Sequence, residues 1–352
     1  MSADKIRVGI IGAGANTRLR HIPGLQEQPG VELVAVANRS AESSARAAKE
    51  YGIPHAAAHW QDIVADETID AVCIGTWPYL HAPITIAALE AGKHVLCEAR
   101  MAMNATEGHA MLRAARARPA LVAQIVPAPH TLHFDQTIID LVADGAIGDL
   151  LAIHAQIVTG SDFPQWDSPP HWRHDRDLSG NNIMVMGIWY EAMMRWVGPA
   201  KTVHAVGQAV VKHRKDATGR RIAMPIPDLI DVLGRMEQGG QMRMSVSNVL
   251  GLASGTEVGL YGTEGTIKLA EGDDGFGLWS GRRGDDALKP VKIAPEKAGD
   301  WRVEEEFINA VRGTEAVTHT DLVTAVKYME WSDAVCMSLS TGETVQLPLF
   351  HA

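Results

Sequence analysis

The chain has 352 residues, with 32 Lys and Arg against 42 Asp and Glu and a formal net charge of −10. This length leaves room for two domains, each with a buried core. The negative charge argues against nucleic acid or an anionic membrane as a partner, and no apolar run approaches the length that spans a bilayer. Cys73, Cys97 and Cys336 show no paired spacing, so we expect free thiols and a cytoplasmic protein.

A glycine-rich turn follows the first apolar segment. Residues 6–11 predict a buried strand, and Gly12-Ala13-Gly14 predicts a tight turn that opens onto a helix. The N–H groups at the start of such a helix favour the pyrophosphate of a dinucleotide. We expect cofactor contacts from Gly12, Gly14, Ala15, Asn16 and Thr17. Thr17 replaces the third small residue of the motif, which predicts a slightly wider spacing between helix and strand.

Strand-like and helix-like segments alternate up to residue 126. The expected strands are 31–37, 55–58, 70–75, 95–98 and 121–126, and the expected helices are 41–51, 60–65, 83–91 and 106–117. This alternation predicts an α/β fold, a doubly wound parallel sheet with helices on both faces. We therefore expect residues 1–126 to form a Rossmann dinucleotide-binding domain.

The end of the second strand bears on the choice of cofactor. An acidic residue there would bind the adenosine ribose of NAD, but the chain has Asn38, Arg39 and Ser40. A guanidinium beside a hydroxyl suits the 2′-phosphate of NADP. We expect NADP in preference to NAD. The alternative is an exposed arginine above the adenine with no phosphate partner.

After Pro127-Ala128-Pro129 the pattern changes to longer, alternating strands. We expect residues 127–352 to form a substrate-binding and oligomerisation domain of the α+β type, with a large, mostly antiparallel sheet open on one face. The expected strands are 151–159, 201–212, 229–237, 241–250, 256–261, 266–269 and 277–280, and the expected helices are 131–143, 183–196, 301–311 and 321–340. The basic segment 212–227 is either a solvated hairpin tip or a contact for phosphate or a partner.

Several motifs occur in the order and spacing of one known family. They are Gly12-Ala13-Gly14, the segment Thr76 to His81, the segment Gly92 to Asn104, and Trp172-Arg173 followed by Asp175 and Ser179-Gly180. Together they resemble the Gfo/Idh/MocA family of NAD(P)-dependent oxidoreductases. The resemblance covers essentially the whole chain and supports the predicted fold.

The resemblance implies that the nicotinamide lies beside His81 and Glu98, and that Thr76 and Trp77 also contact the cofactor. It also implies hydride transfer between nicotinamide and a small carbohydrate-like or cyclic alcohol or ketone, and a homodimer or homotetramer formed through the open sheet.

The chain departs from the family where protons are transferred. The lysine of the family's E-K-P motif is Ala99 here, and Arg100 cannot act as a base because a guanidinium keeps its proton. The helix position that usually carries histidine holds Tyr190 or Trp189, depending on the count. We expect Tyr190, His81 and Glu98 to be catalytic. The alternative for Tyr190 is packing within its helix.

Aromatic and basic side chains of the second domain are the candidate substrate contacts, because flat rings stack on sugar faces. They are Trp166, His171, Trp172, Arg173, Trp189, Tyr190 and His130. Arg173 either binds an acidic or hydroxylated group or pairs with Asp175 or Asp177. We predict no metal site, since His171-x-x-His174-Asp175 lacks a third ligand at a known spacing.

Three functions remain open on this sequence. The first is an oxidoreductase with an atypical proton-transfer site. The second keeps the cofactor but carries out sugar elimination or glycoside cleavage through a transient keto intermediate. The third is a nucleotide-binding regulator without catalysis, which the absence of the usual lysine, aspartate and histidine favours.

Overall fold

A computed structural model of the chain describes residues 5–160 and 163–349. The chain divides into two compact units. One is formed by Met1–Pro127 with Arg302–Val326, and the other by Ala128–Trp301 with Lys327–Ala352. The expected division at residue 127 did not include the return of residues 302–326 to the first unit. These residues return because helix α9 (Val303–Val311) buries Val303, Phe307 and Ile308.

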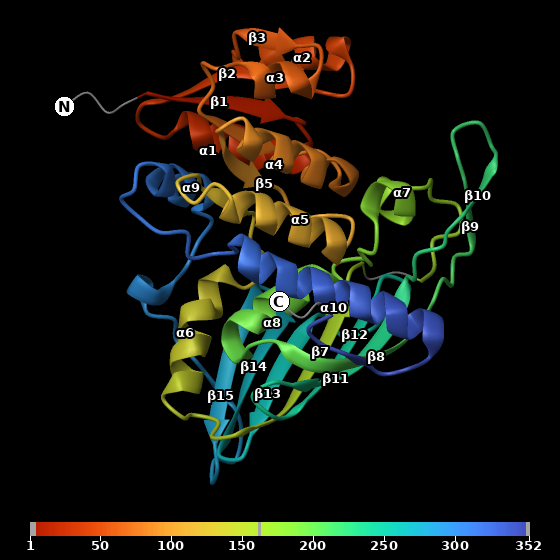
Figure 1. Cartoon of the computed structure of the whole chain (residues 1–352). Helices are drawn as coiled ribbons and strands as arrows, with labels where there is room; N and C mark the ends of the chain where they lie inside the picture. Colours follow the sequence, from red (N-terminus) through yellow and green to blue (C-terminus); the bar gives the residue numbers. More distant parts are fainter. Residues whose placement is uncertain (1–4, 161–162, 350–352) are drawn as a thin grey trace. The chain divides into compact units, whose positions relative to one another are not determined.

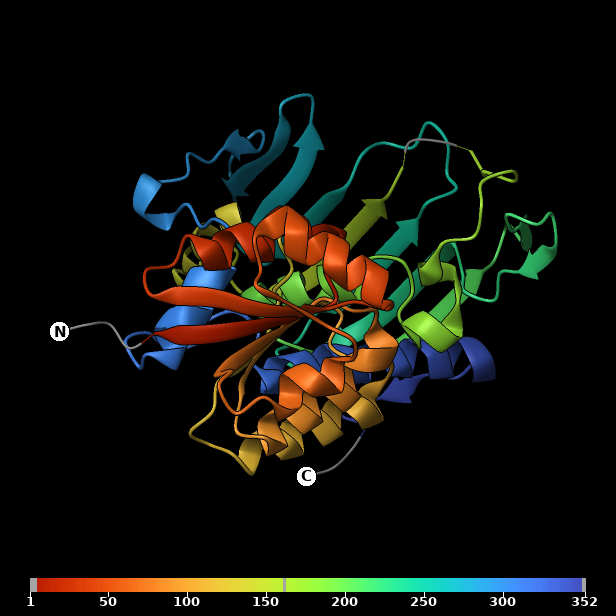
Figure 2. The ribbon, with the colours of Figure 1, turned by 90° about the horizontal axis from the view of Figure 1, so that it is seen from above.

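The first unit contains a parallel sheet, as predicted, whose six strands follow the order β3-β2-β1-β4-β5-β6 (Figure 1). Its strands are β1 (Ile6–Ile11), β2 (Val31–Ala37), β3 (His55–Ala57), β4 (Ala71–Ile74), β5 (His94–Cys97) and β6 (Ala123–Ile125). Its helices include α1 (Ile22–Gln26), α2 (Ala41–Tyr51), α3 (Trp60–Ala65), the 3-10 turn η2 (Pro78–Leu80), α4 (His81–Glu90) and α5 (Ala105–Arg116). Helices lie on both sides of this sheet (Figure 2).

Strand order reverses at β1, which has β2 on one side and β4 on the other. Ligands of open parallel sheets bind beyond the carboxyl ends of the strands at such a reversal. On the β2 side, Ser40 caps α2 by accepting a hydrogen bond from the Ser43 N–H at 3.2 Å. The sheet and its caps therefore present the ends of β1, β2 and β4 to one crevice.

Glycines allow the loops after β1 and β4 to touch. Gly12 has φ +88°, and a Cβ built there would lie 2.7 Å from the Thr76 nitrogen. A Cβ on Gly75 would lie 1.9 Å from Oγ1 of Thr17, which is itself buried. The space that Thr17 needs is therefore supplied by Gly75. The chain then makes one π-helical turn, η1 (Thr17–His21), before α1 begins.

The second unit contains a nine-stranded sheet in the order β16-β15-β14-β13-β7-β12-β11-β8-β17. The strands are β7 (Leu150–Val158), β8 (Ala200–Gln208), β11 (Leu229–Met236), β12 (Gln241–Ser247), β13 (Glu257–Gly262), β14 (Gly265–Gly272), β15 (Gly275–Arg282), β16 (Lys289–Pro290) and β17 (Val345–Gln346). β12 and β7 are parallel and the other neighbours are antiparallel, which confirms the mostly antiparallel prediction. The predicted strand over 201–212 ends earlier, and β9 (His213–Lys215) and β10 (Arg221–Ala223) form a separate basic hairpin.

The second unit also contains helices. They are α6 (Leu132–Ala143), the 3-10 turns η3 (Trp172–His174) and η4 (Pro295–Lys297), α7 (Arg176–Ser179), α8 (Met186–Val197) and the part of α10 (Leu322–Thr341) that belongs to the unit. Alternate strand residues such as Ile230 and Val232 on β11 are buried. Between residues 5 and 349, leaving out 161–162, no helix is long and apolar enough to cross a membrane.

Candidate functional site

A cavity of about 750 Å³ opens at the strand reversal of the first unit. It is lined by residues of the loops after β1, β2, β3 and β4, among them Gly12, Gly14, Asn38, Arg39, Ser40, Thr76 and Trp77. All seven are predicted cofactor residues. Ala15, Asn16, Thr17, His81 and Glu98 are not among the lining residues. The volume lies within the range of small-molecule and cofactor sites.

The lining suits a dinucleotide. The Thr76 hydroxyl is buried and has no hydrogen-bond partner within the described ranges, so it can accept or donate to a ligand. Gly14 is exposed beside it and leaves the loop backbone accessible. At the other end, the exposed guanidinium of Arg39 lies 5.7 Å from the centroid of the Trp77 ring. The residues present therefore fit a nucleotide with its phosphates near the glycine turn.

Two predicted cofactor residues instead hold the site together. Asn38 Oδ1 accepts the Ala13 N–H at 2.7 Å, and Asn38 Nδ2 donates to the Ser43 carbonyl at 3.0 Å. Asn38 therefore ties the glycine turn to α2. Asn16 Nδ2 donates to the Glu98 carboxylate, so the amide links the same turn to the end of β5.

A buried histidine joins two carboxylates behind this loop. His21 Nε2 lies 2.9 Å from Glu98 Oε1, and His21 Nδ1 lies 2.5 Å from Glu304 Oε1. Burial alone would lower the pKa of His21, but the hydrogen bonds and charges of Glu304 and Glu98 raise it to about 9. Burial opposes ionisation of Glu98, yet the His21 and Asn16 interactions hold its pKa below the usual range. We call Glu98, His21 and Glu304 the buried triad.

Sequence reasoning missed two members of the buried triad. His21 lies one helical turn after Thr17, a spacing that places both on one side of η1. Glu304 comes from the return segment, in the first turn of α9. A lone histidine in the sequence predicted neither partner, because the partners lie 77 and 283 residues away along the chain.

His81 does not have the exposure that a catalytic residue needs. It is fully buried, and its Nδ1 and Nε2 each lie 2.9 Å from a carbonyl oxygen, of Arg100 and Thr76 respectively. Desolvation lowers its pKa despite these contacts. The catalytic prediction for His81 is therefore corrected: the imidazole braces the loop after β4 against the loop after β5.

Tyr190 also requires correction. Its side chain is buried on α8 and stacks on Trp331 with ring centroids 4.1 Å apart. Its hydroxyl accepts the Ala200 N–H at 2.8 Å, and burial raises the pKa of the phenol far above its usual value. A phenol in this state neither reaches a substrate nor ionises near neutral pH, so the packing alternative holds for Tyr190.

The remaining predicted substrate residues fall into an exposed and a buried group. Trp166 is 58% exposed, and the Arg173 guanidinium lies 4.3 Å from the Trp172 ring centroid. His171 and Arg173 line a second cavity of about 170 Å³ in this unit. Trp189 is buried instead, so it does not present its indole to a ligand.

No set of three or more His, Cys, Asp or Glu side chains in the described part of the chain could hold a metal ion.

The ring of His130 stacks on buried Trp189. The two centroids are 5.2 Å apart and the rings are within 8° of parallel. His130 is exposed, and desolvation by its neighbours lowers its pKa. No hydrogen bond to its ring nitrogens occurs within residues 5–160 and 163–349. At neutral pH it is therefore an uncharged imidazole with its plane fixed by stacking.

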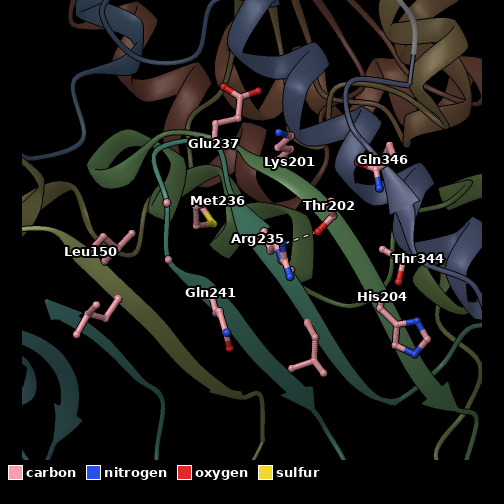
Figure 3. A pocket seen from close by; sticks show the side chains of 15 residues that line it. Leu150, Lys201, Thr202, His204, Arg235, Met236, Glu237, Gln241, Thr344 and Gln346 are labelled. Atoms are coloured by element: carbon pink, nitrogen blue, oxygen red, sulfur yellow. Dashed lines mark hydrogen bonds between the residues drawn. The ribbon is translucent and has the colours of Figure 1, made fainter.

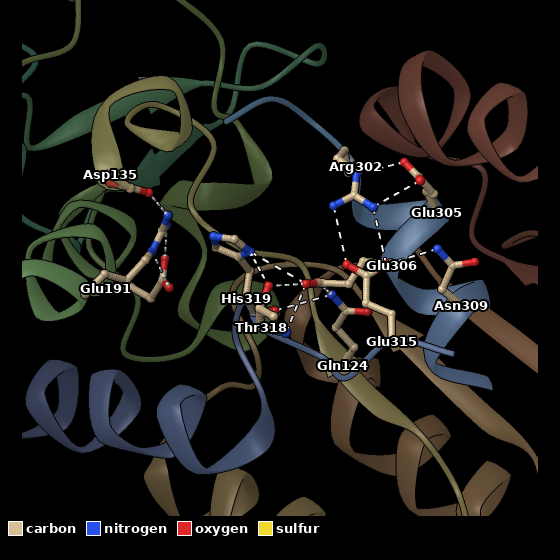
Figure 4. A network of polar contacts seen from close by, with 11 residues as sticks. Gln124, Asp135, Glu191, Arg302, Glu305, Glu306, Asn309, Glu315, Thr318 and His319 are labelled. Carbon is tan, nitrogen blue, oxygen red and sulfur yellow. Dashed lines mark hydrogen bonds and ion pairs between the residues drawn. The ribbon is translucent and has the colours of Figure 1, made fainter. Parts of the chain in front are cut away.

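An ion-pair network fixes the backbone just before His130 (Figure 4). Arg195 on α8 pairs with Asp135 and with Glu191, the latter at 2.8 Å. Glu191 accepts the Ala128 N–H at 2.9 Å, and Arg195 donates to the Ala128 carbonyl at 2.7 Å. Both polar groups of Ala128 are thereby held by one helix, which limits where His130 can lie.

A separate network holds the return segment of the first unit (Figure 4). Gln124 on β6 donates to Glu306 at 2.5 Å, and Glu306 accepts the Thr318 N–H at 2.9 Å. Arg302 pairs with Glu305 at 2.8 Å and with Glu315 at 3.3 Å. These contacts keep α9, and with it Glu304, against the parallel sheet.

A parallel sheet with a nucleotide-sized cavity at its strand reversal, joined to a unit with a large open sheet, defines a two-domain dinucleotide-binding protein. Residues 6–126 match an oxidoreductase family with an NAD-binding Rossmann fold, and residues 136–268 match the GFO/IDH/MocA C-terminal domain. These matches span more than half of the chain. The chain belongs to the Gfo/Idh/MocA oxidoreductase family.

Two of the similar curated proteins are a sugar 3-reductase and a dihydrodiol dehydrogenase. A dTDP-3,4-didehydro-2,6-dideoxy-alpha-D-glucose 3-reductase from Streptomyces antibioticus is 29% identical over 61% of this chain and 63% of its own length. A trans-1,2-dihydrobenzene-1,2-diol dehydrogenase from Bos taurus is 26% identical over 76% of this chain and 73% of its own. The matched region spans 52% to 63% of the length of four curated relatives.

The fold is shared with solved structures. Levoglucosan dehydrogenase, in complex with NADH and L-sorbose, superposes with a TM-score of 0.84 at 22% identity. The superposition covers 98% of this chain and 99% of that enzyme.

The buried triad makes stability depend on pH. The folded pKa of His21, about 9, lies above the ordinary value of about 6.5. The stabilisation from its proton is therefore complete below about pH 6.5 and is lost as pH rises towards 9. We expect His21→Gln to destabilise the protein by about 3 kcal/mol at pH 6.5, because two buried carboxylates lose their cation.

Unfolding by urea at several pH values measures this effect. The difference in free energy of unfolding between His21→Gln and wild type should narrow as pH rises from 6.5 to 9. His133→Gln, an exposed substitution at the start of α6, is the control and should leave stability unchanged at each pH. A gap that stays constant across this range would show that His21 is neutral in the folded protein.

Proposed function

We propose that the protein is an NAD(P)-dependent oxidoreductase that transfers hydride between nicotinamide and a carbohydrate-like alcohol or ketone. The observation that carries this proposal is the nucleotide-sized cavity at the strand reversal, lined by Gly12, Gly14 and the free Thr76 hydroxyl. The sugar reductase and the dihydrodiol dehydrogenase among the relatives support the substrate class. The levoglucosan dehydrogenase complex with NADH supports the cofactor class.

The proposal is tested by incubating the protein with NADP⁺ or NAD⁺ and a panel of sugars, inositols and dihydrodiols, and by following absorbance of the reduced cofactor. Turnover supports it. Product formation without reduced cofactor would instead favour elimination through a transient keto intermediate. Nucleotide binding with no chemistry, even in Ala99→Lys, would favour a regulator.

NADP(H) is the proposed preferred cofactor. Arg39 and Ser40 line the cavity at the end of β2, and the Asn38 side chain is occupied with Ala13 and Ser43. The position that would carry an acidic group for the ribose thus carries none, and the exposed guanidinium of Arg39 follows it in the chain. The 2′-phosphate of NADP can accept charge-assisted hydrogen bonds from the Arg39 guanidinium. The ribose hydroxyl of NAD is neutral and offers no such charge.

Removing the arginine should change selectivity between the two cofactors. We expect Arg39→Ala to weaken NADPH binding by roughly 10- to 100-fold, the value of a hydrogen bond to a charged group, and to leave NADH binding almost unchanged. Fluorescence titration of each nucleotide measures both affinities. Arg113→Ala, which removes an exposed arginine of α5 outside the cavity, is the matched control. An equal loss for both nucleotides would contradict the NADP preference.

We propose His130 as the group that transfers the proton in place of the missing lysine. Two residues, Ala128 and Pro129, lie between His130 and Pro127, where the N-terminal segment of the first unit ends, so the two Cα atoms are at most about 11 Å apart along the chain. Stacking on Trp189 fixes its plane, and its lowered pKa leaves a neutral base at pH 7. When bound, the nicotinamide supplies or accepts hydride. In the oxidation direction the imidazole takes the hydroxyl proton as C=O forms, and it then releases that proton to solvent.

Loss of the imidazole should slow turnover without loss of cofactor. We expect His130→Ala to lower kcat by about 10²- to 10⁴-fold, the usual contribution of general base catalysis. The wild-type oxidation rate should fall at acidic pH, and the fall should lie below the ordinary imidazole pKa of about 6.5, because desolvation lowers the pKa of His130 and it is protonated only there. Added imidazole should partly restore His130→Ala. His133→Ala is the control, and a full rate in His130→Ala would exclude this role.

A second copy of the chain is the proposed partner of the open sheet face. Val206, Leu233 and Tyr261 project outward from β8, β11 and β13 and are 67%, 53% and 37% exposed. A groove of about 970 Å³ runs over β8 and β11 and the starts of β7 and β12, with polar side chains such as Thr202 and Gln241 (Figure 3). Symmetric self-association buries such a mixed face on both copies at once.

Light scattering after gel filtration tests the assembly. We expect a dimer or tetramer of the 38.0 kDa chain, and a shift to smaller species when Leu233→Arg places a charge in the interface. Leu19→Arg changes an exposed leucine of the first unit and should leave the mass unchanged. A monomeric wild type would contradict the proposal.

A further inference from the structure

We infer that the small cavity of the second unit binds the carboxylate of an anionic substrate. The cavity measures about 170 Å³, roughly the liquid volume of five to six waters, which accommodates a carboxylate and the atoms next to it. The inference rests on the proposed function only in taking this unit as the one that holds the substrate. It narrows the substrate class from neutral sugars to acidic ones.

The guanidinium of Arg214 carries the inference. The residue is 8% exposed, on β9, and lines the cavity. Its Nη1 donates to the carbonyl oxygens of Gln165 and Ser168, at 2.8 and 3.1 Å, and contacts the Ser168 hydroxyl. Its Nε is buried and has no hydrogen-bond partner. Among the residues that the structure describes, no carboxylate forms an ion pair with Arg214.

A buried guanidinium without a counter-ion is costly, because the charge has left water and gained only neutral partners. Within the described residues, the one acidic residue of the cavity lining, Asp228, forms no ion pair with Arg214. Asp228 uses Oδ1 to accept the Val210 N–H at 2.6 Å and Oδ2 to accept the Val211 N–H at 3.0 Å. An anion from solution would supply the missing charge.

Two histidines add donors to the same cavity. His171 Nδ1 accepts the Arg173 N–H at 3.3 Å, and His174 Nδ1 accepts the His171 N–H at 3.1 Å. Because Nδ1 is the acceptor in both rings, the proton of each neutral imidazole sits on Nε2. Each ring therefore offers an N–H to a ligand. The Asn248 amide and the Thr159 hydroxyl also belong to the lining.

The charged groups of the cavity predict how binding depends on pH. Desolvation lowers the pKa of His171 and His174, and the nearby Arg173 and Arg214 respectively add to this effect, whereas Asp228 opposes it at His174. A bound carboxylate offsets the positive charges of these arginines and raises the pKa values of His171 and His174. Binding should therefore be accompanied by proton uptake, and affinity should rise as pH falls through the pKa values of these two imidazoles.

Calorimetric titration with D-glucuronate and D-glucuronamide isolates the charge, since the two differ only at the carboxyl group. With NADPH present, we expect wild type at pH 6 to bind glucuronate roughly 10- to 100-fold more tightly than the amide. In Arg214→Gln, which keeps donors for Gln165 and Ser168, this preference should disappear. Arg221→Gln removes an exposed charge from the same hairpin and should keep it.

Proton uptake gives a second measurement that does not depend on Arg214 variants folding well. Titrations in buffers of different ionisation enthalpy should show uptake by wild type and less uptake by His174→Gln. Equal affinity for the acid and the amide in wild type, including no affinity for either, overturns the inference. If NADPH still binds in that case, the proposed function stands. If NADPH does not bind, the proposed function fails as well.

Discussion

The first unit depends on one buried cation between two buried anions. His21 lies between Glu98 and Glu304, and through them it joins the turn after β1, the end of β5 and the first turn of α9. Removing charges from water is unfavourable, so each member is stable only while the other two are in place. The arrangement makes the glycine turn, which the cofactor would contact, part of a larger cooperative group rather than a mobile loop.

The second unit also contains a largely buried cation between two carboxylates. Arg195 lies between Asp135 and Glu191, and this network holds both polar groups of Ala128. Trp189, on the same helix, provides the flat surface for the ring of His130. The helix that lacks the usual histidine of the family therefore still supports one, which is supplied by the neighbouring loop. The role that we propose for His130 would thus move the catalytic group to another element without a change of fold.

Local periodicity predicted most of the fold, because the strands of the parallel sheet are almost wholly apolar and alternate with capped helices. The glycine turn and Arg39 line the cavity for a related reason, since both follow directly from strand ends. Tyr190 and His81 were wrong as catalytic residues because sequence position fixes neither burial nor hydrogen-bond partners. His21, Glu304 and Arg214 could not be found from the sequence, since their significance lies in contacts with distant residues.

The return of residues 302–326 affects how the protein is made. During synthesis the first unit emerges as far as Pro127, and the whole of Ala128–Trp301 must then follow before Glu304 and α9 appear. Until then the nascent first unit holds His21 and Glu98 without their partner and leaves uncovered the surface that Phe307 and Ile308 later bury. Domains usually mature in the order of translation. Here the N-terminal unit, which would hold the nucleotide, is completed only after Ala128–Trp301 and the return segment have left the ribosome.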